Sequence, residues 1–249
     1  HQILPHYYHL MLLSLKNEQI PCRVEKTSGR KMNMKFHPSE SVLIIRTPTG
    51  KYDHQVKQFI EQNETWIVQQ YQKLKGLYGQ KDQFWENIKQ GVLPYMGRPH
   101  KLVFQVGKQR WIKKEGESLI ISVKPGEEAP QHQQSILFNS LKALATSYLK
   151  RRTHELAVKT NSDFNTVRVK NHRSKWGSCS NLRNINLNWL LIFLDESLID
   201  YVIIHELMHL REMNHSPRYW KWVETYYPNY QKARAEVKKN QWLIGIFDN

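Results

Sequence analysis

The sequence predicts an α+β protein: an N-terminal antiparallel β region with long helices, and then a C-terminal domain around one helix that carries an HExxH pattern. Short runs of alternating apolar and polar residues occupy much of residues 22–125, and two longer stretches repeat apolar residues at three- and four-residue steps. The last third contains a helical run that is apolar on almost every side. We expect an N-terminal extension over residues 1–21, a β-rich region with one long helix over 22–130, and a C-terminal domain over 131–249.

The β-rich region begins with three segments that alternate in the manner of strands and are separated by Gly, Pro and Ser. A long amphipathic helix should follow them, and then a turn-rich connector, two further strand segments and a polar stretch that marks the domain boundary. In chain order these predictions cover residues 22–27, 31–38, 41–48, 52–75, 76–91, 94–107, 110–125 and 126–134.

The C-terminal domain should open with a second long helix over residues 135–159, followed by strands near 164–171 and 178–188. Asp195 or Ser197 can cap the apolar helix, which we expect over 198–213. Ser216 and Pro217 form an N-cap and first-turn pair for the next helix. Pro228 separates that helix from a final one over 233–239.

The composition excludes several classes of protein. No apolar run approaches the ~20 residues of a membrane span, and two cysteines are too few for a disulfide scaffold. We therefore expect a cytoplasmic protein with no signal peptide. Lys and Arg number 37 against 22 Asp and Glu, a net charge of +15, and a basic surface can attract nucleic acid as a partner. The charges are dispersed along the chain, which favours an effect on solubility over a nucleic-acid partner.

His205-Glu206-Leu207-Met208-His209 matches HExxH. Histidines four residues apart share one face of a helix and can bind one metal ion, while the intervening Glu can accept a proton from metal-bound water. His215 follows just past the expected helix end, where a chain reversal brings a third imidazole to the ion. Glu224, on the next helix, is the alternative third ligand. Three protein ligands leave one position for water, which is the catalytic arrangement.

The chain resembles the YgjP-like zinc metallopeptidases, which are related to the SprT and WLM groups of zincin-like enzymes. The resemblance rests on residues 172–180, 185–194 and 199–230, with a weaker correspondence at 93–102. It implies a zincin-like catalytic domain and one Zn²⁺ per chain, held by His205, His209 and His215, with Glu206 as general base. Metzincins share the spacing to His215, but Glu212 stands where they carry Gly, so the chain is not placed among them.

The segment around Trp176 carries candidate substrate-binding residues. In zincin-like enzymes an edge strand pairs with an extended peptide, and residues 176–178 with Asn186 and Asn188 suit such a strand pair. Arg173 and Lys175 suit a substrate carboxylate or phosphate. The alternative is that Trp176 is a core aromatic and Arg173 a structural ion-pair partner.

We expect a zinc-dependent peptidase that acts on protein or peptide through a zinc-activated water. Some family members have been described as nucleotide pyrophosphatases, so a metal-dependent nucleoside triphosphate pyrophosphohydrolase is one alternative. A nucleic-acid-associated module that merely retains the metal is the other. The chain contains no Gly-rich phosphate loop, which counts against the first, and the intact Glu206 counts against the second.

Overall fold

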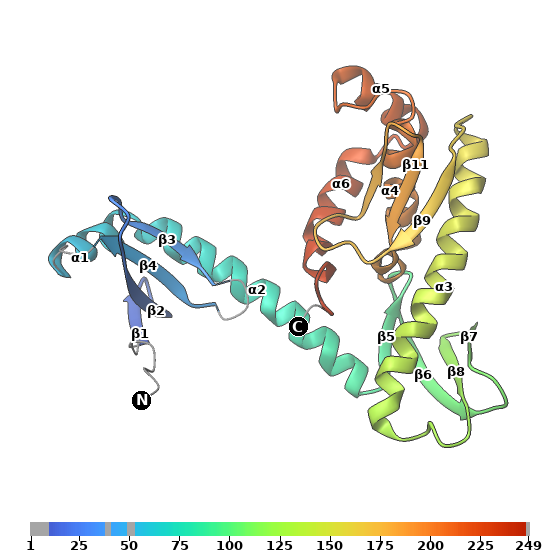
Figure 1. Cartoon of the computed structure of the whole chain (residues 1–249), viewed down its shortest axis with the longest axis horizontal. Helices are drawn as coiled ribbons and strands as arrows, with labels where there is room; N and C mark the ends of the chain where they lie inside the picture. The colour runs from blue at the N-terminus through green and yellow to red at the C-terminus, as the bar shows by residue number, and fades with distance from the viewer. Residues whose placement is uncertain (1–9, 38–40, 49–52, 248–249) are drawn as a thin grey trace. The chain divides into compact units, whose positions relative to one another are not determined.

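The N-terminal strands form one four-stranded sheet backed by helices. The computed structural model describes residues 10–37, 41–48 and 53–247 and divides the chain into two compact units, residues 1–80 and 81–249. In the first unit, apolar residues of the sheet and of the helices over it share one small core that contains Ile20, Leu43 and Ile67. The sheet order is β1 (Met11–Leu15), β2 (Glu18–Thr27), β4 (Leu43–Pro48), β3 (Asn33–Phe36), and the helices are α1 (Asp53–Gln62) and α2 (Glu64–Lys89) (Figure 1).

The expectation of a purely antiparallel N-terminal region is wrong. Strand β2 runs parallel to β4, with Val24 opposite Ile45, while β3 pairs with β4 as an antiparallel edge. Alternation of apolar residues determines which face of a strand is buried but not the direction of its neighbour. Strand β1 also lies inside the segment predicted as an extension, and it pairs with β2 through a turn at Lys16 and Asn17, both with positive φ.

The long helix predicted over residues 52–75 is two helices, and the second continues through the expected connector. The chain breaks at Asn63, whose side-chain amide donates to the Phe59 carbonyl at 2.8 Å. Helix α2 then runs to Lys89 in spite of Gly76 and Gly79, each of which costs a helix about 1 kcal/mol. Packing of Phe84 into the core of the second unit offsets that cost.

The second unit contains two sheets joined by one long helix. The first sheet pairs β6 and β8 in parallel, a second departure from the antiparallel expectation. Helix α3 contacts this sheet and also the sheet that lies beside the C-terminal helices (Figure 1). The elements are β5 (Val92–Tyr95), β6 (Arg98–Val106), β8 (Ser118–Val123) and β7 (Trp111–Glu115) in the first sheet, α3 (Pro130–Lys159), and β10 (Gly177–Cys179), β11 (Asn184–Asn188) and β9 (Thr166–Lys170) in the second.

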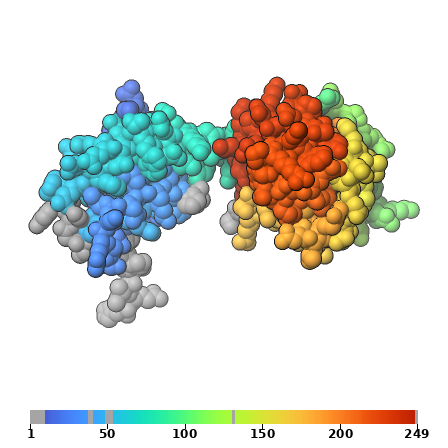
Figure 2. Space-filling view, turned by 90° about the horizontal axis from the view of Figure 1, so that it is seen from above, coloured from blue at the N-terminus to red at the C-terminus, as the bar shows by residue number. Residues whose placement is uncertain are grey.

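The C-terminal segment forms a helical layer on one face of this unit, coloured orange to red in Figure 2, with α3 in yellow along its side. A short and fully buried 3₁₀ helix, η1, leads into α4, the most buried α-helix of the layer. The elements are η1 (Trp189–Phe193), α4 (Glu196–Met208), α5 (Pro217–Tyr226), α6 (Tyr230–Lys239) and η2 (Asn240–Leu243).

One hydrophobic core runs through the whole second unit, from Phe84 to Ile246. It includes Leu119 of the first sheet, Leu141 of α3 and Leu207 of α4. Because that core is continuous, the structure divides within α2 after Gln80, whereas the sequence predicted divisions after residues 21 and 130. The mixed α+β class is confirmed, and no described helix is long and apolar enough to cross a membrane.

Candidate metal centre

Helix α4 positions the first two residues of the HExxH pattern. It begins at the N-cap Asp195, whose carboxylate accepts from the Ser197 backbone N–H at 2.9 Å, so Asp195 is the cap. Ile199 and Ile203 are fully buried, which fixes the helix in the core. The helix ends at Met208, earlier than predicted, and His209 is its C-cap residue in a helical backbone conformation. His205 and His209 therefore keep the one-turn spacing that brings their rings together.

The chain then turns back and brings His215 to the same point. Ser216 caps α5 by accepting from the Tyr219 backbone N–H at 3.2 Å, with Pro217 in the first turn, as predicted. Imidazole nitrogens of His205, His209 and His215 lie within 4.8 Å of one another, and the Nε2 atoms of His205 and His215 are 3.2 Å apart. Glu224 is exposed on α5 and does not belong to this group.

Neighbouring groups orient the His209 imidazole and hold the His205 backbone. Nδ1 of His209 lies 3.1 Å from the Glu212 carbonyl oxygen. Because a carbonyl only accepts, this Nδ1 carries the proton and Nε2 is left with a lone pair for a metal. Tyr219 is fully buried, donates from its hydroxyl to the His205 carbonyl at 2.9 Å, and stacks its ring on His209 with centroids 4.5 Å apart. Tyr219 is therefore a structural support of the triad.

Burial keeps the triad neutral. It lowers the pKa of His205 to about 3, and it lowers the pKa of His209 and His215 as well. Neutral imidazole is the form of histidine that binds a metal. Three neutral imidazoles that lie this close together form a donor set that suits a divalent metal ion.

Glu206 lies next to the triad and is 5% exposed. Burial raises the pKa of its carboxyl group to about 8. Strand β10 packs directly against it: a Cβ atom on Gly177 would lie 2.6 Å from Glu206 Oε1 and 2.7 Å from its Cγ. Only glycine at position 177 leaves this carboxylate room in its present position.

The predicted substrate-binding residues divide into two groups. Lys175 and Trp176 line a cavity of about 280 Å³ together with His205 and Glu206. Arg173 is exposed and Asn186 lies on β11 opposite Ser178, and neither lines that cavity. Asn188 is fully buried, and its side-chain amide donates to the carbonyls of residues 172 and 175, at 2.9 and 3.2 Å, so it holds the loop before β10.

Some residues of the site were not predicted from the sequence. Tyr201 lines the cavity from α4, and Arg234 lines it from α6. Arg234 lies 25 residues beyond His209 and has no motif around it, so only the folded chain brings it to the site. Gly177 lies within the Trp-Gly-Ser segment. A glycine in a strand can mark a close approach of another group, and this is the one indication of its role in the sequence.

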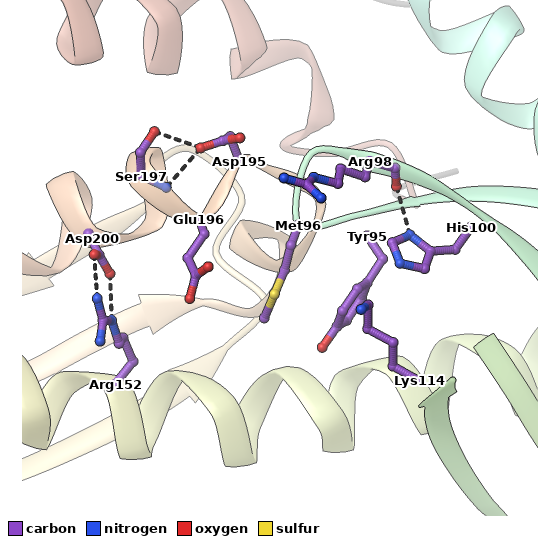
Figure 3. A pocket seen from close by; sticks show the side chains of 10 residues that line it. All are labelled: Tyr95, Met96, Arg98, His100, Lys114, Arg152, Asp195, Glu196, Ser197 and Asp200. Carbon is purple, nitrogen blue, oxygen red and sulfur yellow. Dashed lines mark hydrogen bonds and ion pairs between the residues drawn. The ribbon is translucent and has the colours of Figure 1, made fainter. Parts of the chain in front are cut away.

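A larger cavity of about 590 Å³ lies at the N-terminal end of α4 (Figure 3). Its wall contains the paired charges of Arg152 and Asp200, which form two hydrogen bonds of 2.6 and 2.7 Å. Glu196, also in the wall, accepts from the Tyr148 hydroxyl at 2.9 Å. None of the three histidines lines this cavity, whereas His205 and Glu206 line the smaller one.

A family model described as YgjP-like, metallopeptidase domain, matches residues 30–240 of the chain. Among solved structures, the metallopeptidase zymogen abylysin of Pyrococcus abyssi is 20% identical over 37% of this chain and 93% of its own, with a TM-score of 0.35. The metallopeptidase zymogen jannalysin of Methanocaldococcus jannaschii is 22% identical over 37% of this chain and 95% of its own, with a TM-score of 0.33. No curated protein matches the chain.

Proposed function

The chain belongs to the YgjP-like metallopeptidase family, and from this premise we propose that it is a zinc peptidase in which Glu206 is the general base. The observation that carries the proposal is the convergence of three neutral imidazoles beside a buried carboxylate. We assign the activity to the second unit, residues 81–249, which contains the predicted catalytic segment 131–249.

The spacing of the imidazoles supports zinc as the metal. Two nitrogens bound at about 2.0–2.1 Å to one tetrahedral zinc ion lie about 3.3–3.4 Å apart, and the Nε2 atoms of His205 and His215 are 3.2 Å apart. His205, His209 and His215 would hold the ion, with one position left for solvent. When bound, zinc supplies a Lewis acid that lowers the pKa of a coordinated water towards about 7 and polarises a carbonyl.

Glu206 would accept the proton of the attacking water and then deliver it to the leaving amine. A general base contributes about 10²–10⁴-fold to the rate. Burial raises its pKa, the positive charge of Lys175 offsets only part of that rise, and an adjacent divalent charge would further favour the ionised form that a base needs.

A peptide substrate would extend the small sheet. Strand β10 is at the end of the order β10-β11-β9, and among the described strands none pairs with its outer edge. Backbone groups on that edge suit pairing with an extended peptide. We propose that Lys175 and Trp176 contact the substrate directly, and that Arg173, in the loop before β10, and Asn186, on β11, contact it further from the scissile bond. Asn188 would position the loop before β10 through its two backbone contacts.

The pyrophosphohydrolase alternative draws less support from the site. Among the described residues, the histidine triad is the one group of three or more potential ligands close enough to share a metal, so no cluster of carboxylates for Mg²⁺ accompanies it. A nucleic-acid partner remains a prediction from the net charge of +15.

Elemental analysis of protein purified without added metal tests the proposed zinc site. We expect about one zinc per chain and its loss in His205→Ala. Metal-loaded wild-type protein should then hydrolyse unfolded protein and leave nucleoside triphosphates intact. Zinc content that is sub-stoichiometric and unchanged in His205→Ala, or hydrolysis of nucleotides alone, would contradict the proposal.

A further inference from the structure

Two positively charged side chains line the cavity beside Glu206. It is lined by Lys175, Arg234 and Glu206, with residues of β10, α4 and α6 around them. Neither Lys175 nor Arg234 forms an ion pair with a carboxylate among the described residues. Glu206, the one acidic residue of the lining, is the proposed base, so the cavity has an excess of positive charge where substrate would lie.

Stacking orients the Arg234 guanidinium. Its Cζ lies 4.7 Å from the centroid of the Trp220 ring. Trp220 also stacks on His215, with ring centroids 5.5 Å apart. It stacks on Tyr230 as well, with ring centroids 5.2 Å apart. A guanidinium held over an aromatic ring can still donate its N–H groups to a planar anion, and Arg234 lines the same cavity as His205 and Glu206.

Tyr201 adds a hydrogen-bond donor to the same cavity. Its side chain is 3% exposed, yet its hydroxyl forms no hydrogen bond within the part of the chain that the structure describes. The hydroxyl is not one of the fully buried atoms that lack a partner, so it can donate to a ligand in the cavity that Tyr201 lines. The unpaired cations and this hydroxyl therefore point to the same kind of ligand, an anion with acceptor oxygens.

We propose that this cavity is a subsite for a carboxylate of the substrate, bound by Arg234 with Tyr201 and Lys175, which makes the enzyme selective for peptides that carry a carboxylate next to the scissile bond. The inference rests on the proposed peptidase function. The carboxylate can come from an acidic side chain or from a free C-terminus, and both present the same planar pair of oxygens.

Binding of labelled peptides to the full-length, zinc-loaded Glu206→Gln protein tests the subsite without turnover. One pair of peptides differs only by Glu or Gln at an internal position, and a second pair only by a free or amidated C-terminus. We expect the carboxylate member of one pair to bind about tenfold more tightly at low salt, because both cations are exposed and partly screened. The pair whose two members differ in affinity identifies the source of the carboxylate, an acidic side chain or a free C-terminus.

A matched pair of charge variants tests whether Arg234 binds the carboxylate. Arg234→Gln should abolish the difference within the pair, whereas Lys232→Gln should retain it. Lys232 is exposed on the same helix two residues away, outside the lining, and the change removes the same charge. Equal affinity for the two peptides within both pairs would overturn the subsite. So would an equal loss of the affinity difference in Arg234→Gln and Lys232→Gln, or binding of ATP with no binding of any peptide.

Cleavage of the same peptides by the wild-type protein separates the two proposals. Preferential binding without cleavage would contradict the peptidase function and leave the subsite standing. Cleavage of all four peptides at equal kcat/KM would leave the function standing and contradict the subsite.

Discussion

Replacing Gly177 by Ala should displace the Glu206 carboxylate without touching the three imidazoles. The added Cβ would lie 2.6, 2.7 and 2.9 Å from Oε1, Cγ and Cδ of Glu206, and these are its three nearest neighbours. Ordinary contact begins near 3.4 Å, so the carboxylate must move by about 0.8 Å. Because the new atom is too close to Cγ as well as to the carboxylate, rotation of the carboxylate alone does not relieve both contacts.

A displacement of about 1 Å in a catalytic geometry costs up to about 10²-fold in rate. We therefore expect kcat/KM on a cleaved peptide to fall by between about tenfold and about 10²-fold. Overpacking should reduce the free energy of unfolding by about 1–3 kcal/mol. Zinc content should stay at the wild-type value, because none of the three histidines is among the nearest neighbours of the new atom.

Peptide hydrolysis, elemental analysis and thermal unfolding of the same preparation provide the assay. Gly79→Ala is the matched control: no atom lies within 4 Å of its Cβ position in α2. That variant should keep wild-type activity and gain about 0.5–1 kcal/mol in unfolding free energy. The reasoning is refuted if folded Gly177→Ala with full zinc hydrolyses the peptide within twofold of the wild-type rate.

Three further outcomes follow from the same structure. His215→Ala should weaken zinc affinity more than Glu224→Ala does in a competition titration with a chelator, and the reverse order would make Glu224 the third ligand. Gly97→Ala should lower the free energy of unfolding, measured by denaturant titration, by about 1–3 kcal/mol. The reason is that φ is +73° at this residue and an added Cβ would lie 2.8 Å from the Cα of Asp195, the N-cap of α4. An unchanged free energy of unfolding would contradict that geometry. Burial raises the pKa of both Cys22 and Cys179 to about 11, so native alkylation at pH 7 should be slow and should accelerate as the pH rises towards that value. A native thiol that reacts at pH 7 as fast as free cysteine would show that burial does not protect it.

The parts of the site that the sequence predicted are those determined by local chain geometry. The HExxH spacing puts His205 and His209 one turn apart in any helix. The caps that bound this segment, Asp195 and Ser216, are also local, because each accepts from a backbone N–H within three residues. The sequence also predicted that His215 reaches the other two histidines, because a helix end near His209 allows the chain to turn back.

The parts that sequence could not predict depend on contacts between distant segments. Parallel pairing of β2 with β4 and of β6 with β8 is a choice of neighbour that alternation does not encode. Arg234 reaches the cavity because α6 packs against α4. The close approach of Gly177 to Glu206 is likewise visible only once β10 lies on α4.

Glu206→Gln tests the central claim most directly, because the amide matches the carboxylate in size and cannot accept the proton of water. The measurement is kcat on a cleaved peptide, with zinc content determined on the same samples. The account predicts about one zinc per chain in both proteins and a kcat that is about 10²–10⁴-fold lower in the variant. Wild-type turnover by the zinc-loaded variant would contradict the assignment of Glu206 as the general base.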